Sequence, residues 1–189
     1  MIEKIKELCE KNYPKRHYDY HIVSVVDNAL LLAKRLNADV EIVEVAAYLH
    51  DIAWAFEKCR RDNEHHVVGA KKTEEILREF GYDEEFIKKV THCVLTHRGR
   101  NDLAPKTIEA KIIANADAMA HFDTFLDLFS FFMEGNSFED AVSELIDKMD
   151  RNWNKKLTLP EAKEMVEEKY KASVLLLNEM QKYIDKRHK

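Results

Sequence analysis

A helical spacing of apolar residues runs through this sequence, and few residues interrupt it. Apolar side chains recur three and four positions apart, as in the stretch 2–9 and along Val25, Ala29 and Leu32. Four glycines and three prolines occur among 189 residues, whereas an all-β chain needs many more turn residues. The pattern therefore predicts an all-α fold, built as a helical bundle.

Capping side chains recur just before the apolar stripes. Ser, Thr and Asp accept hydrogen bonds from the free N–H groups of a first helical turn. The expected N-caps are Asp39, Asp83, Thr107 and Ser137. Gly81 is expected just past a helix end, and the sequence Thr-Leu-Pro-Glu at 158–161 fits a capping box that starts the last helix. One uninterrupted helix is expected from Thr107 to about Phe132.

The length of the chain suits a single domain over residues 1–189. The residues with chemical interest all precede about position 121, and we expect a metal-binding core over about 17–125. Helices over about 137–188 are expected to pack on it as a C-terminal extension. The apolar run Phe129, Phe131, Phe132 and Met133 is expected in the core, although it could also be a dimer surface, so a homo-oligomer stays open.

Charge and cysteine content narrow the environment and the partners. The net charge is −5, which disfavours nucleic-acid binding. Three cysteines with no CxxC pair favour a reducing, cytoplasmic compartment. The sequence has no apolar run of about 18 residues and no secretory signal, so no membrane association is expected.

Four polar, metal-capable residues interrupt the apolar stripes of separate predicted helices. They are His21, His50, His97 and Asp117, and Asp51 adjoins one of them. Burying so many unpaired groups would cost several kcal/mol each, and a divalent cation would compensate all of them together. Imidazole and carboxylate suit Mn, Fe, Co, Ni or Zn, and the lack of thiolates argues against a closed structural zinc site.

The order and surroundings of these residues resemble a known superfamily. His21, then His50-Asp51, then Asp117 resemble the H…HD…D pattern of the HD-domain metal-dependent phosphohydrolases. The local sequences AAYLHDI at 46–52 and AKIIANAD at 110–117 are also similar to that family. The resemblance covers about residues 17–125, and it implies that these four residues hold one metal ion.

Two further segments resemble the subset of that family with two metal ions. HHVVGA at 65–70 is similar to an HxxxGA segment, which selects His65; helical periodicity alone leaves His65 and His66 equivalent. THRGR at 96–100 is similar to the segment that supplies another ligand, His97. The resemblance implies that Asp51 bridges to a second ion held by His65 and His97, and these three are the candidate catalytic residues. Whether one or two ions bind stays open.

Basic residues beside these ligands are candidates for binding substrate phosphate. Lys58 and Arg61 lie on the connection between Asp51 and His65, and Arg98 and Arg100 follow His97. Most surface Lys and Arg residues have no specific role, but this position next to candidate ligands favours these four.

Four neighbouring residues have less specific interpretations. His17 lies near a segment end and is expected in solvent, whereas His121 is expected to support Asp117 rather than to bind metal. Trp54 stands where many family members have Lys; a packing role is favoured for it over stacking on a base or ring of a ligand. Asn115 stands where an Asp is common in the family, and the sequence offers no explanation for the change.

The residues and the resemblance together favour hydrolysis of a small phosphate ester or anhydride, a nucleotide above all, by a metal-bound hydroxide. The sequence has neither a P-loop nor a GxSxG motif. Two alternatives stay open: a di-iron oxygenase of the same fold, and a non-enzymatic nucleotide- or metal-binding domain. The sequence leaves the substrate and the metal unidentified.

Overall fold

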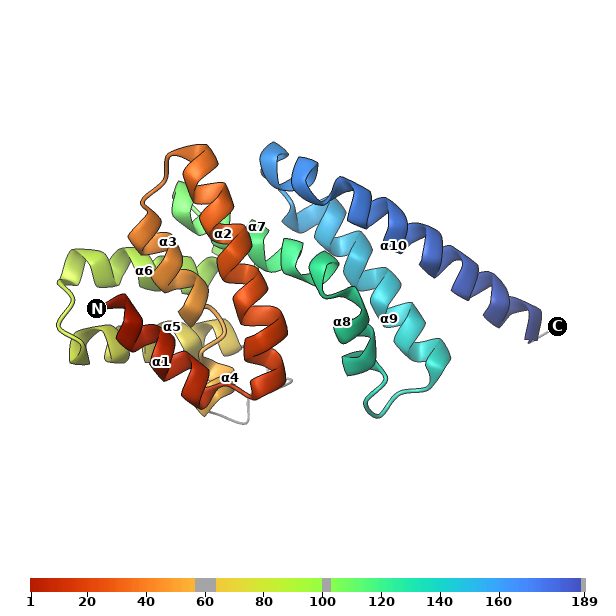
Figure 1. The fold of residues 1–189 in the computed structure, drawn as a ribbon, viewed down its shortest axis with the longest axis horizontal. Coiled ribbons are helices and arrows are strands. Elements are labelled where there is room, and N and C mark those ends of the chain that lie inside the picture. Colours follow the sequence, from red (N-terminus) through yellow and green to blue (C-terminus); the bar gives the residue numbers. More distant parts are fainter. Residues whose placement is uncertain (57–63, 100–102, 188–189) are drawn as a thin grey trace.

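Every regular element in residues 1–56, 64–99 and 103–187, the ranges described by the computed structural model, is a helix. This confirms the all-α prediction (Figure 1). The elements are α1 (Ile2–Asn12), η1 (His17–Ile22), α2 (Val23–Leu36), α3 (Val40–Leu49), α4 (Ala53–Phe56), α5 (His65–Glu79), α6 (Glu84–Thr96), α7 (Ile108–Asp123), α8 (Phe125–Phe132), α9 (Phe138–Arg151), η3 (Asn152–Lys156) and α10 (Pro160–Arg187). None of them combines the length and the apolar content that a membrane span requires.

Most helix ends lie where capping chemistry predicts them. The side chains of the four expected N-caps accept hydrogen bonds from first-turn N–H groups of α3, α6, α7 and α9. Gly81 follows α5 with a φ of +80°, a left-handed conformation that glycine adopts without a steric penalty. These helix boundaries therefore follow from local hydrogen bonds of short polar side chains, and tertiary packing is not needed to explain them.

Helix α7 is buried on all sides, and the rest of the molecule packs around it. Its residues from Ile112 to Phe122 are all buried. It contacts α2, α3 and α6 on one side and α9's continuation η3 and α10 on the other. Figure 1 shows α7 extending from the group α1–α6 towards the group α8–α10. A helix that is buried around its whole circumference needs neighbours on every face, so α7 joins the two groups.

The predicted helix from Thr107 to Phe132 is wrong in its second half, because the chain breaks at Thr124. There φ is −110° and ψ is +35°, and α8 begins at the next residue. Among its residues none is buried, and the side chain of Leu126 is 73% exposed. The break lays α8 against α9, and the helix reaches the core only with half-buried side chains such as Phe125 and Leu128.

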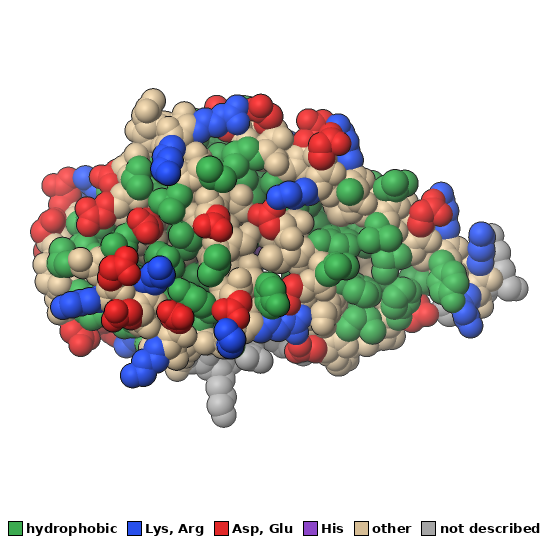
Figure 2. All heavy atoms as spheres, in the orientation of Figure 1, with side chains coloured by type: hydrophobic (Ala, Val, Ile, Leu, Met, Phe, Trp, Pro, Cys, Tyr) green, Lys and Arg blue, Asp and Glu red, His purple; other side chains and the backbone are tan. Residues whose placement is uncertain are grey.

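The expected core position of the Phe-rich run is therefore wrong for Phe131 and Met133, whereas Phe129 and Phe132 pack against the core. Phe131 and Met133 are exposed, and Phe129 and Phe132 are half-buried. Phe131 and Phe132 line a large pocket instead. Figure 2 shows hydrophobic side chains gathered at the end of the molecule where α8, α9 and α10 lie.

Asn115 joins α7 to the segment that leads into α10. Its Oδ1 accepts hydrogen bonds from the backbone N–H groups of Thr158 and Leu159, at 2.9 and 3.0 Å. Its Nδ2 donates to the carbonyl of Lys111 at 2.8 Å and to Thr158 Oγ1 at 3.1 Å. The predicted capping box is wrong, because α10 begins at Pro160 and the Thr158 hydroxyl contacts Asn115. These four hydrogen bonds of a fully buried side chain explain why position 115 is Asn and not Asp, because an ionised carboxylate has no N–H to donate.

Replacing Asn115 with Ala is expected to lower the free energy of unfolding by about 2–4 kcal/mol, since it removes four hydrogen bonds of a fully buried side chain and leaves the Thr158 and Leu159 N–H groups without this acceptor. Urea denaturation followed by circular dichroism measures this. The matched control is Asn154→Ala, because Asn154 is exposed and its amide bonds only Asp150 among the described residues. Equal destabilisation by both substitutions would contradict the role given to Asn115.

Candidate metal centre

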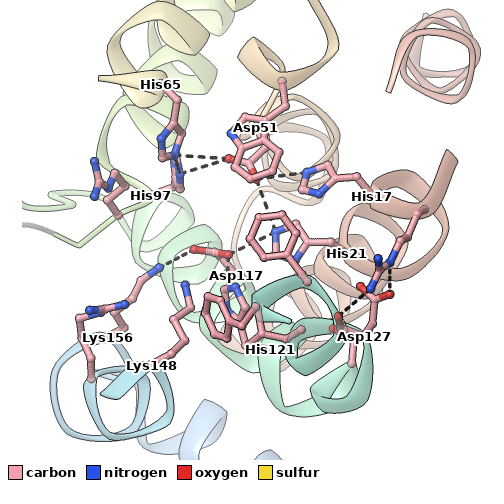
Figure 3. A pocket seen from close by; sticks show the side chains of 18 of the residues that line it. His17, His21, Asp51, His65, His97, Asp117, His121, Asp127, Lys148 and Lys156 are labelled. Atoms are coloured by element: carbon pink, nitrogen blue, oxygen red, sulfur yellow. Dashed lines mark hydrogen bonds and ion pairs between the residues drawn. The ribbon is translucent and has the colours of Figure 1, made fainter. Parts of the chain in front are cut away.

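The predicted ligands converge on a pocket of about 1080 Å³. Its lining comes from η1 and the residues before it, the α3–α4 turn, α4, α5, the turn after α6, α7, α8, α9 and η3. Residues far apart in the sequence thus meet at one place, which Figure 3 shows from close by. The candidate ligands form two groups within it, and Asp51 belongs to both.

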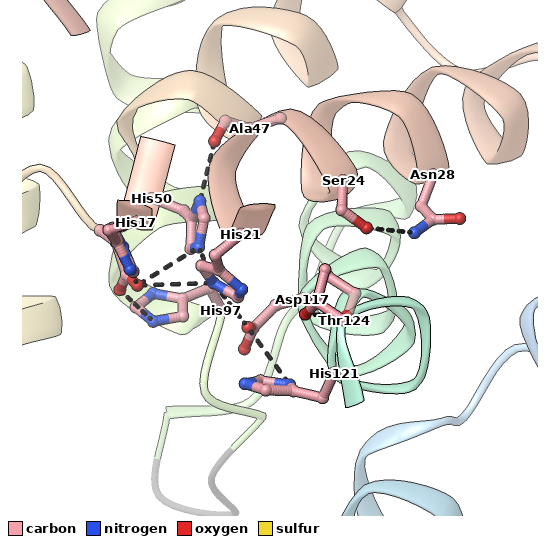
Figure 4. A network of polar contacts seen from close by, with 12 residues as sticks. His17, His21, Ser24, Asn28, Ala47, His50, His97, Asp117, His121 and Thr124 are labelled. Atoms are coloured by element: carbon pink, nitrogen blue, oxygen red, sulfur yellow. Dashed lines mark hydrogen bonds and ion pairs between the residues drawn. The ribbon is translucent and has the colours of Figure 1, made fainter. Parts of the chain in front are cut away.

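The first group surrounds His21, which η1 presents to the pocket. Its Nε2 lies 3.2 Å from His50 Nε2, 3.4 Å from Asp117 Oδ1 and 3.6 Å from Asp51 Oδ2. Figure 4 shows the side chains of His21, His50 and Asp117 pointing toward one another. Segment His17–Ile22 is a π-helix, an uncommon geometry that is frequent at functional sites.

The second group uses the other oxygen of the same carboxylate. Asp51 Oδ1 lies 3.6 Å from His65 Nε2 and 3.6 Å from His97 Nε2, and the two imidazole nitrogens are 3.3 Å apart. The structure places His65 in this group, whereas His66 is buried and is absent from the pocket lining. Asp51 therefore faces one group with each oxygen.

Two of the histidines are oriented by the helices that they end. His50 Nδ1 is 2.8 Å from the carbonyl oxygen of Ala47, and His97 Nδ1 is 2.7 Å from that of Val94. A carbonyl can only accept, so in both rings Nδ1 carries the hydrogen. The lone pair of Nε2 then points into the group, as it does in metal-binding histidines.

The electrostatics favour ionised carboxylates at Asp51 and Asp117 and a neutral imidazole at His97. Burial on its own would raise the pKa of Asp51, but the adjacent His50 holds that pKa well below its ordinary value. Burial would also raise the pKa of Asp117, but Lys156, which forms an ion pair with this carboxylate, holds its pKa well below the ordinary value. Burial lowers the pKa of His97 to about 3. Metal binding requires these same protonation states.

The spacing of the atoms fits metal coordination. Ligands about 2.1 Å from a tetrahedral ion lie about 3.4 Å apart, and the contacts within both groups range from 3.2 to 3.6 Å. The donors are imidazole nitrogens and carboxylate oxygens, which suit divalent transition metals. The residues present could therefore hold a divalent metal ion in either group.

Comparison with known proteins identifies the family. A family model of the HD domain matches residues 18–121, which is more than half of the chain. The chain belongs to the HD-domain family. The matched range contains every residue of the two groups just described, and HD domains bind divalent metals.

Curated relatives share only this part. The chain is 32% identical to ribonuclease Y of Acidothermus cellulolyticus over 100 residues, which are 53% of this chain and 18% of that protein. It is 33% identical to the tRNA (cytidine(56)-2'-O)-methyltransferase of Thermoplasma volcanium over 122 residues, 57% of this chain and 33% of that protein. The chain thus spans a third or less of the length of these relatives.

Solved structures match over nearly the whole chain. Bacillus subtilis YpgQ, in a crystal structure in complex with ADP, is 22% identical with a TM-score of 0.74, covering 97% of this chain and 98% of that one. A predicted HD superfamily hydrolase from an uncultured Thermotogales bacterium is 19% identical with a TM-score of 0.63, covering 96% and 91%. At these identities the matches establish a shared fold, including the helices that follow the HD domain.

Two further histidines adjoin the groups, and the expectation for one of them is wrong. His17 is not in solvent: its ring stacks on Trp54 with centroids 4.8 Å apart, and its Nε2 lies 3.3 Å from Asp51 Oδ2. The four-residue spacing from His21 was the available signal, since such residues share a helix face. His121 is buried, with Nδ1 3.9 Å from Asp117 Oδ1.

The Lys and Arg residues that line the pocket differ from those that the sequence led us to expect. Arg98 lines the pocket, but Lys58, Arg61 and Arg100 lie outside the described residues. Four further cations come from the segment after the HD domain and were missed: Lys148, Arg151, Lys155 and Lys156. The available signal was weak: a basic cluster at the end of α9 and in η3, with no motif around it.

Substituting Asp51 with Asn should remove transition metal from the purified protein, because Asp51 faces both groups and an amide is a poorer ligand than a carboxylate. Wild type is expected to hold about two ions per chain, measured by elemental mass spectrometry on protein without a histidine tag. Asp27→Asn is the matched control, since Asp27 is exposed on α2 and is absent from the pocket lining.

The metal content separates three cases. About two ions in wild type, lost in Asp51→Asn and kept in Asp27→Asn, agrees with two groups that share Asp51. One ion would restrict metal binding to one group and leave the other for substrate. No metal after reconstitution with Mn, Fe, Co, Ni and Zn would rule out a metal centre here.

Proposed function

We propose that this protein is a metal-dependent phosphohydrolase that cleaves a small phosphate ester or anhydride, with a nucleotide as the favoured substrate. One observation carries the proposal: Asp51 presents one oxygen to each of two histidine groups, in a pocket that also holds a wall of Lys and Arg side chains. Phosphate chemistry needs both features, since the phosphoryl oxygens are negative throughout.

In this proposal His21, His50, Asp51 and Asp117 hold one divalent ion, and Asp51, His65 and His97 hold a second. Mn, Fe, Co, Ni and Zn all suit these donors. When bound, such ions lower the pKa of water towards ~7 and neutralise charge on a phosphoryl group.

The chain's own residues supply orientation and binding. The Ala47 and Val94 carbonyls hold the rings of His50 and His97 in place. The cations from α9 and η3 would attract the phosphoryl group to the same side of the pocket as Asp117, with which Lys156 pairs.

The organic part of the substrate has a different surface to contact. Trp54, Leu128, Phe131 and Phe132 line the pocket, and the rings of Trp54 and Phe131 lie 6.4 Å apart. Aromatic side chains are suited to pack against a planar base. That YpgQ was crystallised in complex with ADP supports a nucleotide, and a relative named ribonuclease Y supports phosphoester chemistry.

The size of the pocket argues against one form of the non-enzymatic alternative, in which the metal only stabilises the fold. A purely structural metal needs no pocket of about 1080 Å³ next to it. The net charge of −5 favours a small substrate over a nucleic acid.

The test is a screen of phosphate monoesters, diesters and nucleotides with protein loaded with Mn²⁺ or Co²⁺. Asp51→Asn is expected to lower kcat on the best substrate by about a thousandfold, or ~4 kcal/mol of activation free energy. Phosphate release measures the rate.

Asp27→Asn should retain wild-type turnover. Hydrolysis that persists in Asp51→Asn, or that needs no metal, would contradict the proposal. Oxygen consumption by iron-loaded protein, without phosphate release, would instead support the oxygenase.

A further inference from the structure

Lys148 lies in the pocket without an ion-pair partner among the described residues, and Asp117 and Asp51 act on it only from a distance. It stands in the last turn of α9, half-buried, and lines the pocket. Within the described residues no hydrogen bond or ion pair reaches its Nζ, whereas Lys156 beside it pairs with Asp117. Figure 3 shows both lysines extending toward Asp117, with a dashed line from Lys156 alone.

The surroundings of Lys148 disfavour its positive charge. Burial, and then the nearby Lys156, lower the pKa of the Lys148 ammonium to about 8. Removing an ammonium from water is unfavourable unless an opposite charge or acceptor replaces the lost solvent. An anionic ligand in the pocket would supply that compensation.

The other cations of the pocket divide into engaged and available ones. Arg16 is engaged, because it bonds to Asp127 and Glu134 at 2.6 and 2.8 Å. Arg151, one turn after Lys148, also lines the pocket. In the part of the chain that the structure describes, no acidic side chain forms an ion pair with Arg151. Lys148 and Arg151 are therefore both placed to bind an anion.

We propose that Lys148 and Arg151 form an anion site that receives a phosphoryl group of the ligand beside the candidate metal centre. The identity of the anion rests on the proposed function, but the site itself rests on the placement of the two side chains. An ammonium and a guanidinium together offer a compact charge and a planar fork of donors, which suits a phosphate with several oxygens.

This site assigns a function to the segment after the HD domain. The family match ends at residue 121, and both cations belong to α9. The metal-capable residues would thus come from the HD domain, and the recognition of the ligand's anionic group from the added helices. Lys156 and Asn115 hold the two parts in register, through Asp117 on one side of α7 and Thr158 on the other.

The experiment measures the binding of inorganic phosphate by isothermal titration calorimetry. The full chain is used both after chelation and after reloading with Mn²⁺. Lys148→Met is expected to weaken phosphate binding about tenfold or more, and Arg151→Met several-fold, with unchanged metal content. Lys148→Arg should restore much of the affinity. The control is Lys182→Met, an exposed lysine of α10 that pairs with Glu179.

Several outcomes would overturn the proposal. They are equal phosphate affinity of wild type and both Met variants, no phosphate binding by wild type in either state, and acetate binding that depends on Lys148 as strongly as phosphate binding does. Arg151 is exposed, so Arg151→Met keeps the test valid if Lys148→Met does not fold. Lys148-dependent phosphate binding in a protein that hydrolyses nothing would support the anion site and contradict only the proposed function.

Discussion

The rest of this structure depends on keeping two carboxylates ionised inside a helical core. Asp51 and Asp117 are both buried, and an isolated buried carboxylate would become protonated rather than remain charged. Here imidazoles from four segments of the bundle lie next to Asp51, and Lys156 pairs with Asp117. The groups around the two carboxylates therefore come from segments far apart in the sequence, and the bundle must close before the site exists.

Helix α7 connects the buried carboxylates to the C-terminal segment. Asn115 and Asp117 are two residues apart and so point to roughly opposite sides of the helix. One holds the chain before α10, and the other faces the pocket and pairs with Lys156. A helix buried all round can serve both sides at once, which is why α7 carries small alanines between its polar residues. The added helices thereby become part of the pocket wall.

The HD domain and the C-terminal helices differ in the chemistry of the side chains that they bring to the pocket. Imidazole and carboxylate donors, all within the HD domain, suit a metal ion, whereas lysine and arginine from α9 and η3 suit an anion. The protein as a whole is acidic, yet its pocket has a basic side. An overall charge therefore says little about the charge of a concave site, where a few residues from distant segments dominate the local field.

Local signals in the sequence were enough for three predictions. Helical periodicity predicted the all-α fold, and short polar side chains predicted the N-caps at Asp39, Asp83, Thr107 and Ser137. The ordered ligand motif indicated the HD family. The sequence could not determine the break at Thr124, the exposure of α8 or the position of His17, because these depend on which faces meet. The lysines of α9 and η3 carry no motif, and only the docking of that segment on α7 brings them beside Asp117. Tertiary structure decided them because convergence in space is set by packing, which nearby residues in the chain do not encode.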